Sequence, residues 1–185
     1  DRRDDDVALY SSRGPTAHDF LAKPDLVAPG TAITSLVSPN SKMYLEKPQY
    51  LMSGSRSTAY KPYLTLSGTS MATGVVSGSV ALMIEGAKAT FGAAPPVNAI
   101  KAMLQVSAFA MTAPDSHPYH VLAQGAGSLN TAGALTLAQA INPTVPVGSS
   151  WLTTGITTST TIDGQNIVWG DHIVWGDHIV WGDHI

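Results

Sequence analysis

The sequence predicts a fold that mixes short β-strands with longer helices. Short apolar runs recur in the first third of the chain, each beside a turn signal such as Pro-Gly. Three longer segments follow, in which apolar residues recur at helical spacing or cover every side of the helix. A chain of 185 residues, 44% of them hydrophobic, is long enough for one domain with a core.

The predicted strands share a short apolar run that ends at a turn. They lie at residues 7–11, 26–28, 33–37 and 63–66. A Ser-Arg-Gly-Pro turn at residues 12–15 follows the first, and a Pro-Gly pair ends the second. Residues 38–61 are polar, irregular and rich in Ser, Lys and Tyr. We therefore expect a surface excursion there, with a hairpin at residues 50–52.

Three helices are predicted after the last strand. Residues 70–85 carry no charge until their end and are small or apolar on all sides, which predicts a buried helix. Its two glycines each cost roughly 1 kcal/mol relative to alanine and indicate close packing against another element. A second helix is expected at residues 95–108, opened by a proline pair, and a third at residues 131–141.

The C-terminal quarter has a different composition. Residues 143–166 are rich in Ser and Thr and predict a linker. Residues 167–185 hold three perfect copies of Ile-Val-Trp-Gly-Asp-His and the first Ile of a fourth. Because six is an even number, an extended chain keeps the same face in every copy. The repeats favour a β-prone extracellular tail over metal binding by the Asp-His pairs.

Composition excludes several functions. The net charge of -3 gives no support for nucleic acid or an anionic membrane as the main partner. The chain has no cysteine, so disulfides and cysteine metal sites are absent. The longest uncharged apolar run, residues 71–84, is too short to span a bilayer. The chain starts without methionine and stops partway into a repeat, so we expect both ends to be cut.

The segment with the most chemistry is residues 68–72, Gly-Thr-Ser-Met-Ala. A strand candidate ends just before it and the predicted buried helix follows. Ser70 would lie at the positive end of the helix macrodipole, with its own backbone N–H free to donate to an oxyanion. A serine at a helix start is most often only a cap for that helix. Local pattern alone therefore does not make Ser70 a nucleophile.

Residues 68–72 resemble the serine motif of the subtilase family. Three further segments resemble blocks of the same family in the same order. They are residues 10–15, Tyr-Ser-Ser-Arg-Gly-Pro; residues 23–30, Lys-Pro-Asp-Leu-Val-Ala-Pro-Gly; and residues 125–130, Gly-Ala-Gly-Ser-Leu-Asn. Four blocks in register identify the chain as similar to the C-terminal part of a subtilase catalytic domain.

This resemblance implies a subtilisin-like α/β fold with a mainly parallel sheet between helices, of which this chain holds only the C-terminal part, followed by a repetitive tail. It implies a triad in the chain order Asp, His, Ser, the order known for subtilisin. Ser70 would attack the peptide carbonyl, a histidine would take its proton, and the Ser70 N–H would supply half of the oxyanion hole. Thr69 would be an accessory neighbour of that hole.

In the family, the Asp, the His and the oxyanion-hole Asn all precede the block at residues 10–15. We therefore assign none of these roles here and expect this chain alone to be inactive. Residues 1–141 should also supply only part of the sheet and leave an apolar face open. Gly74 stands where the family usually has proline, which loosens the helix start without removing the function.

The histidines leave one alternative. A Gly-x-Ser-x-Ala segment also resembles the nucleophile elbow of α/β-hydrolases, in which the acid and the histidine follow the serine. Ser70, Asp115 and His117 would then form the triad, although an acid and a histidine two residues apart rarely converge on one site in that fold. His18 is expected on the surface, and His120 in the loop with His117.

The sequence predicts three regions. Residues 1–142 are the C-terminal part of a subtilase catalytic domain, residues 143–166 the linker and residues 167–185 the repeat tail. Because the tail lies beyond the last family block, removing residues 149–185 should leave hydrolysis nearly unchanged.

The predicted function is that of a secreted bacterial serine endopeptidase, which hydrolyses protein or peptide substrates through an acyl-enzyme on Ser70. This chemistry needs no cofactor; a structural calcium ion is compatible with it, but no residue here is assigned to one. Neither a nucleic acid nor a membrane is an expected partner. The alternative is a non-catalytic extracellular surface or adhesion protein on a subtilase scaffold. Retention of Ser70 favours the enzyme, because a scaffold does not need a nucleophile.

Overall fold

The computed structural model describes residues 5–54, 60–146, 148–162, 164–169, 174–175 and 179–180. Its strands are β1 (Ile33–Leu36), β2 (Leu51–Met52), β3 (Tyr63–Leu66), β4 (Ser159–Ile162), β5 (Gln165–Val168), β6 (Val174–Trp175) and β7 (Ile179–Val180). Its helices are α1 (Lys42–Glu46), the 3-10 helix η2 (Pro48–Tyr50), α2 (Thr69–Phe91), α3 (Val97–Ser107), α4 (Val121–Gln124) and α5 (Thr131–Ala140). The predicted mixture of helices and strands is confirmed.

The three-stranded sheet is antiparallel. β3 lies between β1 and β2, with Ile33 opposite Leu66 and Leu51 opposite Leu64. The mainly parallel sheet that the resemblance implied is not found in the described ranges, where the parallel pairing is limited to one isolated bridge. β1 and β3 are the two ends of one excursion that folds back on itself. Such a return connection makes neighbouring strands antiparallel.

Two of the predicted strands do not form as expected. Residues 7–11 are irregular. In the segment 26–28, only Leu26 and Val27 form isolated bridges, to Gly125 and Ser128, instead of a ladder. Both segments lack a full-length neighbouring strand among the described residues, and a strand needs such a neighbour for its backbone hydrogen bonds. The strands expected at 33–37 and 63–66 are confirmed as β1 and β3.

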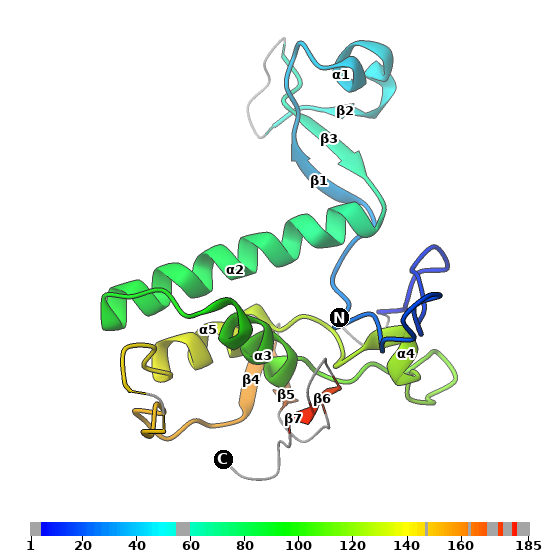
Figure 1. The fold of residues 1–185 in the computed structure, drawn as a ribbon. Coiled ribbons are helices and arrows are strands. Elements are labelled where there is room, and N and C mark those ends of the chain that lie inside the picture. The colour runs from blue at the N-terminus through cyan, green and yellow to red at the C-terminus, as the bar shows by residue number, and fades with distance from the viewer. Residues whose placement is uncertain are drawn as a thin grey trace.

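The surface excursion predicted at residues 38–61 carries α1, η2 and β2, and with the flanking strands β1 and β3 it forms an arm. It projects away from the helical body of the molecule (Figure 1). Its tip is held by stacked rings of Tyr44 and Tyr60, with centroids 5.6 Å apart, and by the Tyr60 hydroxyl, which donates to the Val37 carbonyl oxygen at 2.8 Å. Leu36 and Leu45 remain mostly exposed. The arm therefore stands apart from the helical core (Figure 1).

The core lies where α2 and α3 pack on α5 (Figure 1). Met83 of α2 and Met103 of α3 are buried there, together with Leu137 of α5. Asn130 caps α5, because its side-chain oxygen accepts from the Gly133 N–H at 3.0 Å. All three predicted long helices are confirmed, with α2 running on to Phe91.

The expected burial of α2 on all sides is wrong. Its buried residues are Ser79, Met83, Gly86 and Ala87, which lie in its C-terminal part. Among the described elements, the main helix packed on α2 is α5, and it covers one face only. Gly74 and Gly78 are exposed, and a Cβ on either would meet nothing within 4 Å. The close packing expected at those two glycines is therefore absent from the described structure.

α2 is long and apolar enough to cross a membrane by length and composition. The uncharged run at residues 71–84 is itself too short, but the helix that contains it continues past Glu85 and Lys88 to Phe91. Length and composition do not separate a membrane span from a core helix of a globular domain. Met83 and Ala87 have no exposed surface, so one side of α2 already serves as core.

The segment expected as a linker is structured in its second half. β4 pairs antiparallel with β5, with Thr160 opposite Ile167, and β4 contacts α5. Trp169, from the first repeat, is 1% exposed and belongs to the same buried cluster as Met83 and Leu137. Trp169 of the tail therefore packs into the core formed by α2, α3 and α5. This removes the reason to expect that cutting residues 149–185 would be harmless.

The open side of α2 gives a testable prediction. We expect the isolated chain to bind a hydrophobic dye strongly and to melt without a sharp transition, because an apolar face of the core is uncovered. Dye fluorescence and a thermal scan of purified residues 1–185 check this, with the intact protein as the comparison. A sharp, cooperative melt of a soluble monomer that binds no dye would contradict the prediction.

Candidate active site

The serine turn joins β3 to α2. Gly68 is the N-cap of α2 and has φ 153° and ψ 164°, a conformation that residues with a side chain rarely adopt. Its carbonyl oxygen accepts from the Met71 N–H at 3.0 Å and from the Ala72 N–H at 3.3 Å. The chain thus passes from strand to helix within two residues. Ser70 consequently lies in the first turn of α2.

Ser70 is exposed, and its side chain has no hydrogen-bond partner within the described ranges. Its backbone N–H is one of the first helical donors, and no described carbonyl accepts it. The positive end of the helix dipole lies at the same place. A hydroxyl without a hydrogen-bond partner can attack a carbonyl carbon, and a free N–H beside it can stabilise the resulting oxyanion. The N-cap role falls to Gly68, so Ser70 is not explained as a cap.

The second block supports the serine turn from below. The Gly68 N–H donates to the Gly30 carbonyl oxygen at 2.8 Å. A Cβ on Gly30 would lie 2.8 Å from the Gly68 carbonyl oxygen and 3.1 Å from the Ala72 Cβ, so only glycine allows this approach. The Ser67 hydroxyl accepts from the Ala32 N–H at 2.9 Å. These contacts fix the backbone on either side of Gly68.

The first block contacts the second. The Tyr10 hydroxyl lies 2.5 Å from the Thr31 Oγ1 and 3.4 Å from the Gly30 carbonyl oxygen. Gly14 approaches Lys23 closely, because a Cβ on Gly14 would lie 2.3 Å from the Lys23 carbonyl oxygen. Residues 10–15 therefore brace the segment that carries the serine turn.

The fourth block holds the same segment from its other end. The Val27 N–H donates to the Gly127 carbonyl oxygen at 2.9 Å, and the Leu129 N–H donates to the Val27 carbonyl oxygen at 2.8 Å. Gly125 has φ 63°, and a Cβ there would lie 2.3 Å from the Pro24 carbonyl oxygen. The four sequence blocks thus form one connected unit, although 109 residues, 16–124, lie between the first and the last.

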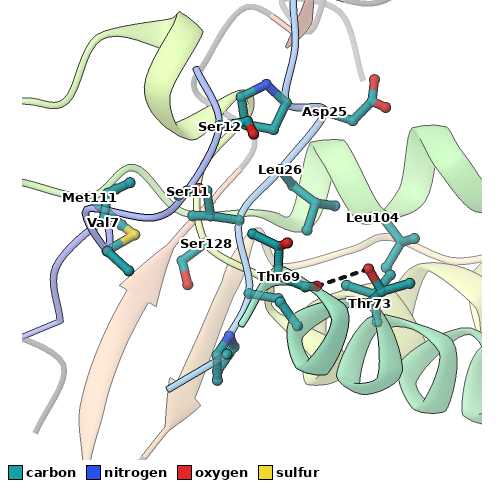
Figure 2. Close-up of a pocket in the computed structure, with 18 of the residues that line it drawn as sticks. Val7, Ser11, Ser12, Asp25, Leu26, Thr69, Thr73, Leu104, Met111 and Ser128 are labelled. Atoms are coloured by element: carbon teal, nitrogen blue, oxygen red, sulfur yellow. Dashed lines mark hydrogen bonds between the residues drawn. The ribbon is translucent and has the colours of Figure 1, made fainter. Parts of the chain in front are cut away.

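An apolar cavity of about 1120 Å³ lies beside this unit. Figure 2 shows Thr69 and Thr73 of α2 at its edge, with Leu26 and Leu104 lining it. The Thr73 hydroxyl donates to the Thr69 carbonyl oxygen at 3.0 Å. Ser70 is not among the lining residues. The cavity is therefore an uncovered face of the core next to the serine turn, and not a pocket centred on the serine.

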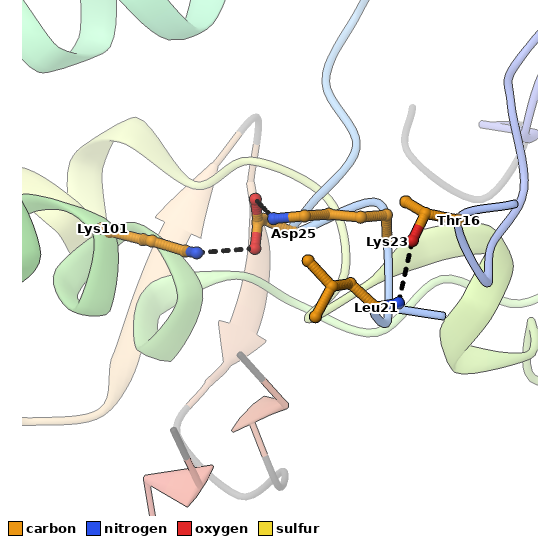
Figure 3. Close-up of polar contacts among 5 residues, drawn as sticks. All are labelled: Thr16, Leu21, Lys23, Asp25 and Lys101. Atoms are coloured by element: carbon orange, nitrogen blue, oxygen red, sulfur yellow. Dashed lines mark hydrogen bonds and ion pairs between the residues drawn. The ribbon is translucent and has the colours of Figure 1, made fainter. Parts of the chain in front are cut away.

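Asp25 ties the second block to α3. Figure 3 shows Asp25 between two lysines, with Lys23 Nζ 2.9 Å from Oδ2 and Lys101 Nζ 3.0 Å from Oδ1. The geometry of the second contact is that of an ion pair and not of a hydrogen bond. Burial raises the pKa of Asp25, but the Lys23 hydrogen bond and the two positive charges outweigh it. The pKa is therefore held below its ordinary value.

No described histidine contacts Ser70. His117 Nδ1 lies 3.4 Å from Asp115 Oδ2 in an exposed loop, and His120 Nδ1 accepts from the Leu122 N–H at the start of α4. The alternative triad of Ser70, Asp115 and His117 is thus not assembled. Aspartate and histidine residues of the repeats lie outside the described residues. The described chain supplies a serine and an N–H donor, but no general base.

Sequence reasoning found the serine and the four blocks but not the contacts that join them. Gly30, Ser67 and Tyr10 position the serine turn, and each lies in or beside a recognised block. The glycine of the Pro29-Gly30 pair was the sequence signal for the contact with Gly68, because two backbones can approach so closely only at a glycine.

Comparison with known proteins shows which family this chain resembles. The profile of the subtilase family matches residues 2–139. Serine protease AprX of Bacillus subtilis is 48% identical over 82 residues, which cover 44% of this chain and 17% of AprX. Pyrolysin of Pyrococcus furiosus is 34% identical over 148 residues, 78% of this chain and 9% of pyrolysin. Minor extracellular protease Vpr of Bacillus subtilis is 31% identical over 137 residues, 74% of this chain and 14% of Vpr. The chain thus spans less than a fifth of the length of these relatives.

The Asp25 ion pairs predict a pH dependence. Because the pKa of Asp25 is lowered in the folded state, its stabilisation is present above the unfolded-state pKa and is lost as the pH falls through the folded-state pKa. Asp25→Asn should therefore lower stability at neutral pH, and the difference from wild type should shrink below about pH 4. Denaturant unfolding of the intact protein at several pH values checks this. Asp5→Asn, an exposed site, is the control; an equal effect of Asp25→Asn at pH 3 and pH 7 would contradict the assignment.

Proposed function

On the ground that the chain belongs to the subtilase family, we propose that it is the nucleophile-bearing part of a serine endopeptidase. The observation that carries the proposal is the serine turn, held by three other family blocks and leaving the Ser70 hydroxyl and N–H uncommitted. Hydrolysis of peptide bonds needs a nucleophile, an oxyanion donor and a general base. The described residues offer the first two.

In the proposed mechanism the Ser70 Oγ attacks the carbonyl carbon of the scissile peptide bond. The hydroxyl proton passes to a histidine, and the Ser70 N–H donates to the developing oxyanion. The proton then goes to the leaving amine, and water releases the acyl group from Ser70. The histidine, its aspartate and the oxyanion-hole asparagine are supplied by a part of the protein upstream of residue 10. The length of the relatives leaves room for that part.

The substrates are proposed to be proteins or peptides in extended conformation, and Gly68 lets their backbone approach the serine. The proposed chemistry requires no cofactor. Extracellular action is proposed because one relative, Vpr, is named as an extracellular protease. Neither a nucleic acid nor a membrane surface is proposed as a partner, since the net charge is -3 and the buried face of α2 already packs on α5.

Ser70 gives the direct test of this function. In the intact protein, a serine-directed fluorophosphonate should label Ser70 and no other serine, because acylation needs an activated hydroxyl. Ser70→Ala should lower turnover by about 10⁶-fold, the scale measured for the nucleophile of subtilisin. Mass spectrometry of the labelled protein identifies the site, and casein hydrolysis measures turnover. The isolated chain, which lacks the base, should hydrolyse no casein.

Ser77 and Ser79 lie on the same helix and are the internal controls. Label on either of them, or on Ser116, would refute Ser70 as the nucleophile. A folded intact protein that takes no label would favour the non-catalytic scaffold. Casein hydrolysis by purified residues 1–185 would show that the base lies within this chain.

Gly30 gives a second test, of how the serine is positioned. Gly30→Ala puts a Cβ 2.8 Å from the Gly68 carbonyl oxygen and displaces the serine turn. A displacement near 1 Å typically costs about 10²-fold in rate, so kcat/KM should fall by about that factor while the protein stays folded. Gly155→Ala is the matched control, because a Cβ there meets nothing within 4 Å. Equal activity of the two variants would show that Gly30 does not position the turn.

A further inference from the structure

Trp169 is the anchor of the repeat tail. It is 1% exposed and shares a buried cluster with Leu129 of the fourth block and Leu137 of α5. Ile167 of the same repeat packs against that cluster as a partly buried neighbour. The Trp-slot, defined here as the surface formed by Leu129, Leu137 and Thr160 that receives Trp169, thus binds the Ile and the Trp of one repeat.

Polar contacts recognise the indole N–H of Trp169, in addition to the size of the ring. The Trp169 Nε1–H donates to the Thr160 Oγ1 at 2.7 Å, and the Asn130 Nδ2 donates to the same oxygen at 3.4 Å. The Trp169 backbone N–H donates to the Thr158 carbonyl oxygen at 2.9 Å. Buried indoles need such a partner for their N–H. Asn130 also caps α5, so the slot is attached to the fourth family block.

The side chains that fill the slot recur along the tail. Residues 173–178 and 179–184 repeat Ile-Val-Trp-Gly-Asp-His without a change. Because the period is six, a shift of one repeat keeps every side chain on the same face of the strand. Ile173 and Trp175 would then take the positions of Ile167 and Trp169, and Val174 would lie opposite Ser159 as Val168 does now.

We propose that the Trp-slot is a binding site for an Ile-Val-Trp strand, and that the second repeat of the same chain is an alternative ligand for it. The tail then has two registers on the catalytic part. In the present register Ile167 and Val168 of the first repeat lie in β5, and Trp169 fills the slot. In the other register the second repeat does so, and the first repeat becomes part of the connection after β4.

The cost of the shift is small. The connection between β4 and β5 grows from two residues, 163–164, to eight, 163–170. Two doublings of loop length disfavour the shifted register by about sevenfold. The shift also gives up the pairing of β6 with β7, which joins two residues of each strand. An isolated hairpin of that size contributes little. The slot contacts, by contrast, are the same in both registers.

Pairs of introduced cysteines can report which register β5 adopts, because the chain contains no cysteine of its own. Ser159 and Val168 are paired across β4 and β5, at a separation that suits a disulfide. In the intact protein in a thiol–disulfide buffer, Ser159→Cys with Val168→Cys reports the present register. Ser159→Cys with Val174→Cys reports the shifted one. Ser159→Cys with Asp177→Cys is the control, since residue 177 faces Ser159 in neither register.

The 159–174 disulfide should form at about one-seventh of the yield of the 159–168 disulfide, and clearly above the 159–177 control. Adding Trp169→Ala should raise the 159–174 yield severalfold, because the second repeat then holds the better anchor. Adding Trp175→Ala as well should remove that increase. Linked peptides are identified by mass spectrometry and chain linkage by non-reducing electrophoresis.

Two results would overturn the proposal. A 159–174 yield equal to the 159–177 control, with Trp169 intact, would show that the register is fixed. A 159–174 disulfide that joins two chains would show that the slot takes the repeat of a second copy instead. The Trp169-intact comparison does not depend on whether Trp169→Ala folds.

Discussion

The backbone contact between Gly30 and Gly68 is the constraint on which the candidate site depends. It places two chain segments closer together than any side chain allows, and it does so directly under the first turn of α2. Residues 24–30 can make this contact because Tyr10 holds the Gly30 end of the segment and Gly125 lies against its Pro24 end. Ser70 therefore owes its position to four segments spread over the chain, and its exposed hydroxyl has no hydrogen-bond partner within the described ranges.

The sequence was a better guide to the four family blocks than to the sheet. Glycines at residues 30, 68 and 125 belong to recognisable blocks, because their backbone geometry tolerates no other residue. The antiparallel pairing of β1 and β3 was not predictable from the resemblance, since it arises from the excursion peculiar to this arm. The burial of α2 was overestimated for a related reason. An apolar side predicts a contact, but it does not say whether the contacting element lies in the same chain.

Composition alone did not predict the structure of the C-terminal segment. Ser and Thr predicted a linker at residues 143–166, yet Thr160 is the acceptor that orients Trp169 in the core. The Thr160 hydroxyl oxygen accepts from two buried donors, the Trp169 Nε1–H and the Asn130 Nδ2. These hydrogen bonds hold a polar segment against the core. The repeats were recognised as β-prone, but their anchor on the fourth family block depends on Asn130, whose cap of α5 gave no hint of a second role. Ile167 and Trp169 of the first repeat thus pack with the fourth block and α5 in one cluster.

The central claim is that Ser70 carries the acyl group and that its own N–H binds the oxyanion. A crystal structure of the intact protein with a peptide boronate tests it most directly. The account predicts a bond between boron and the Ser70 Oγ, and a boronate oxygen about 2.7–3.1 Å from the Ser70 nitrogen. A boronate bound to any other residue, or an oxygen directed away from the start of α2, would contradict it.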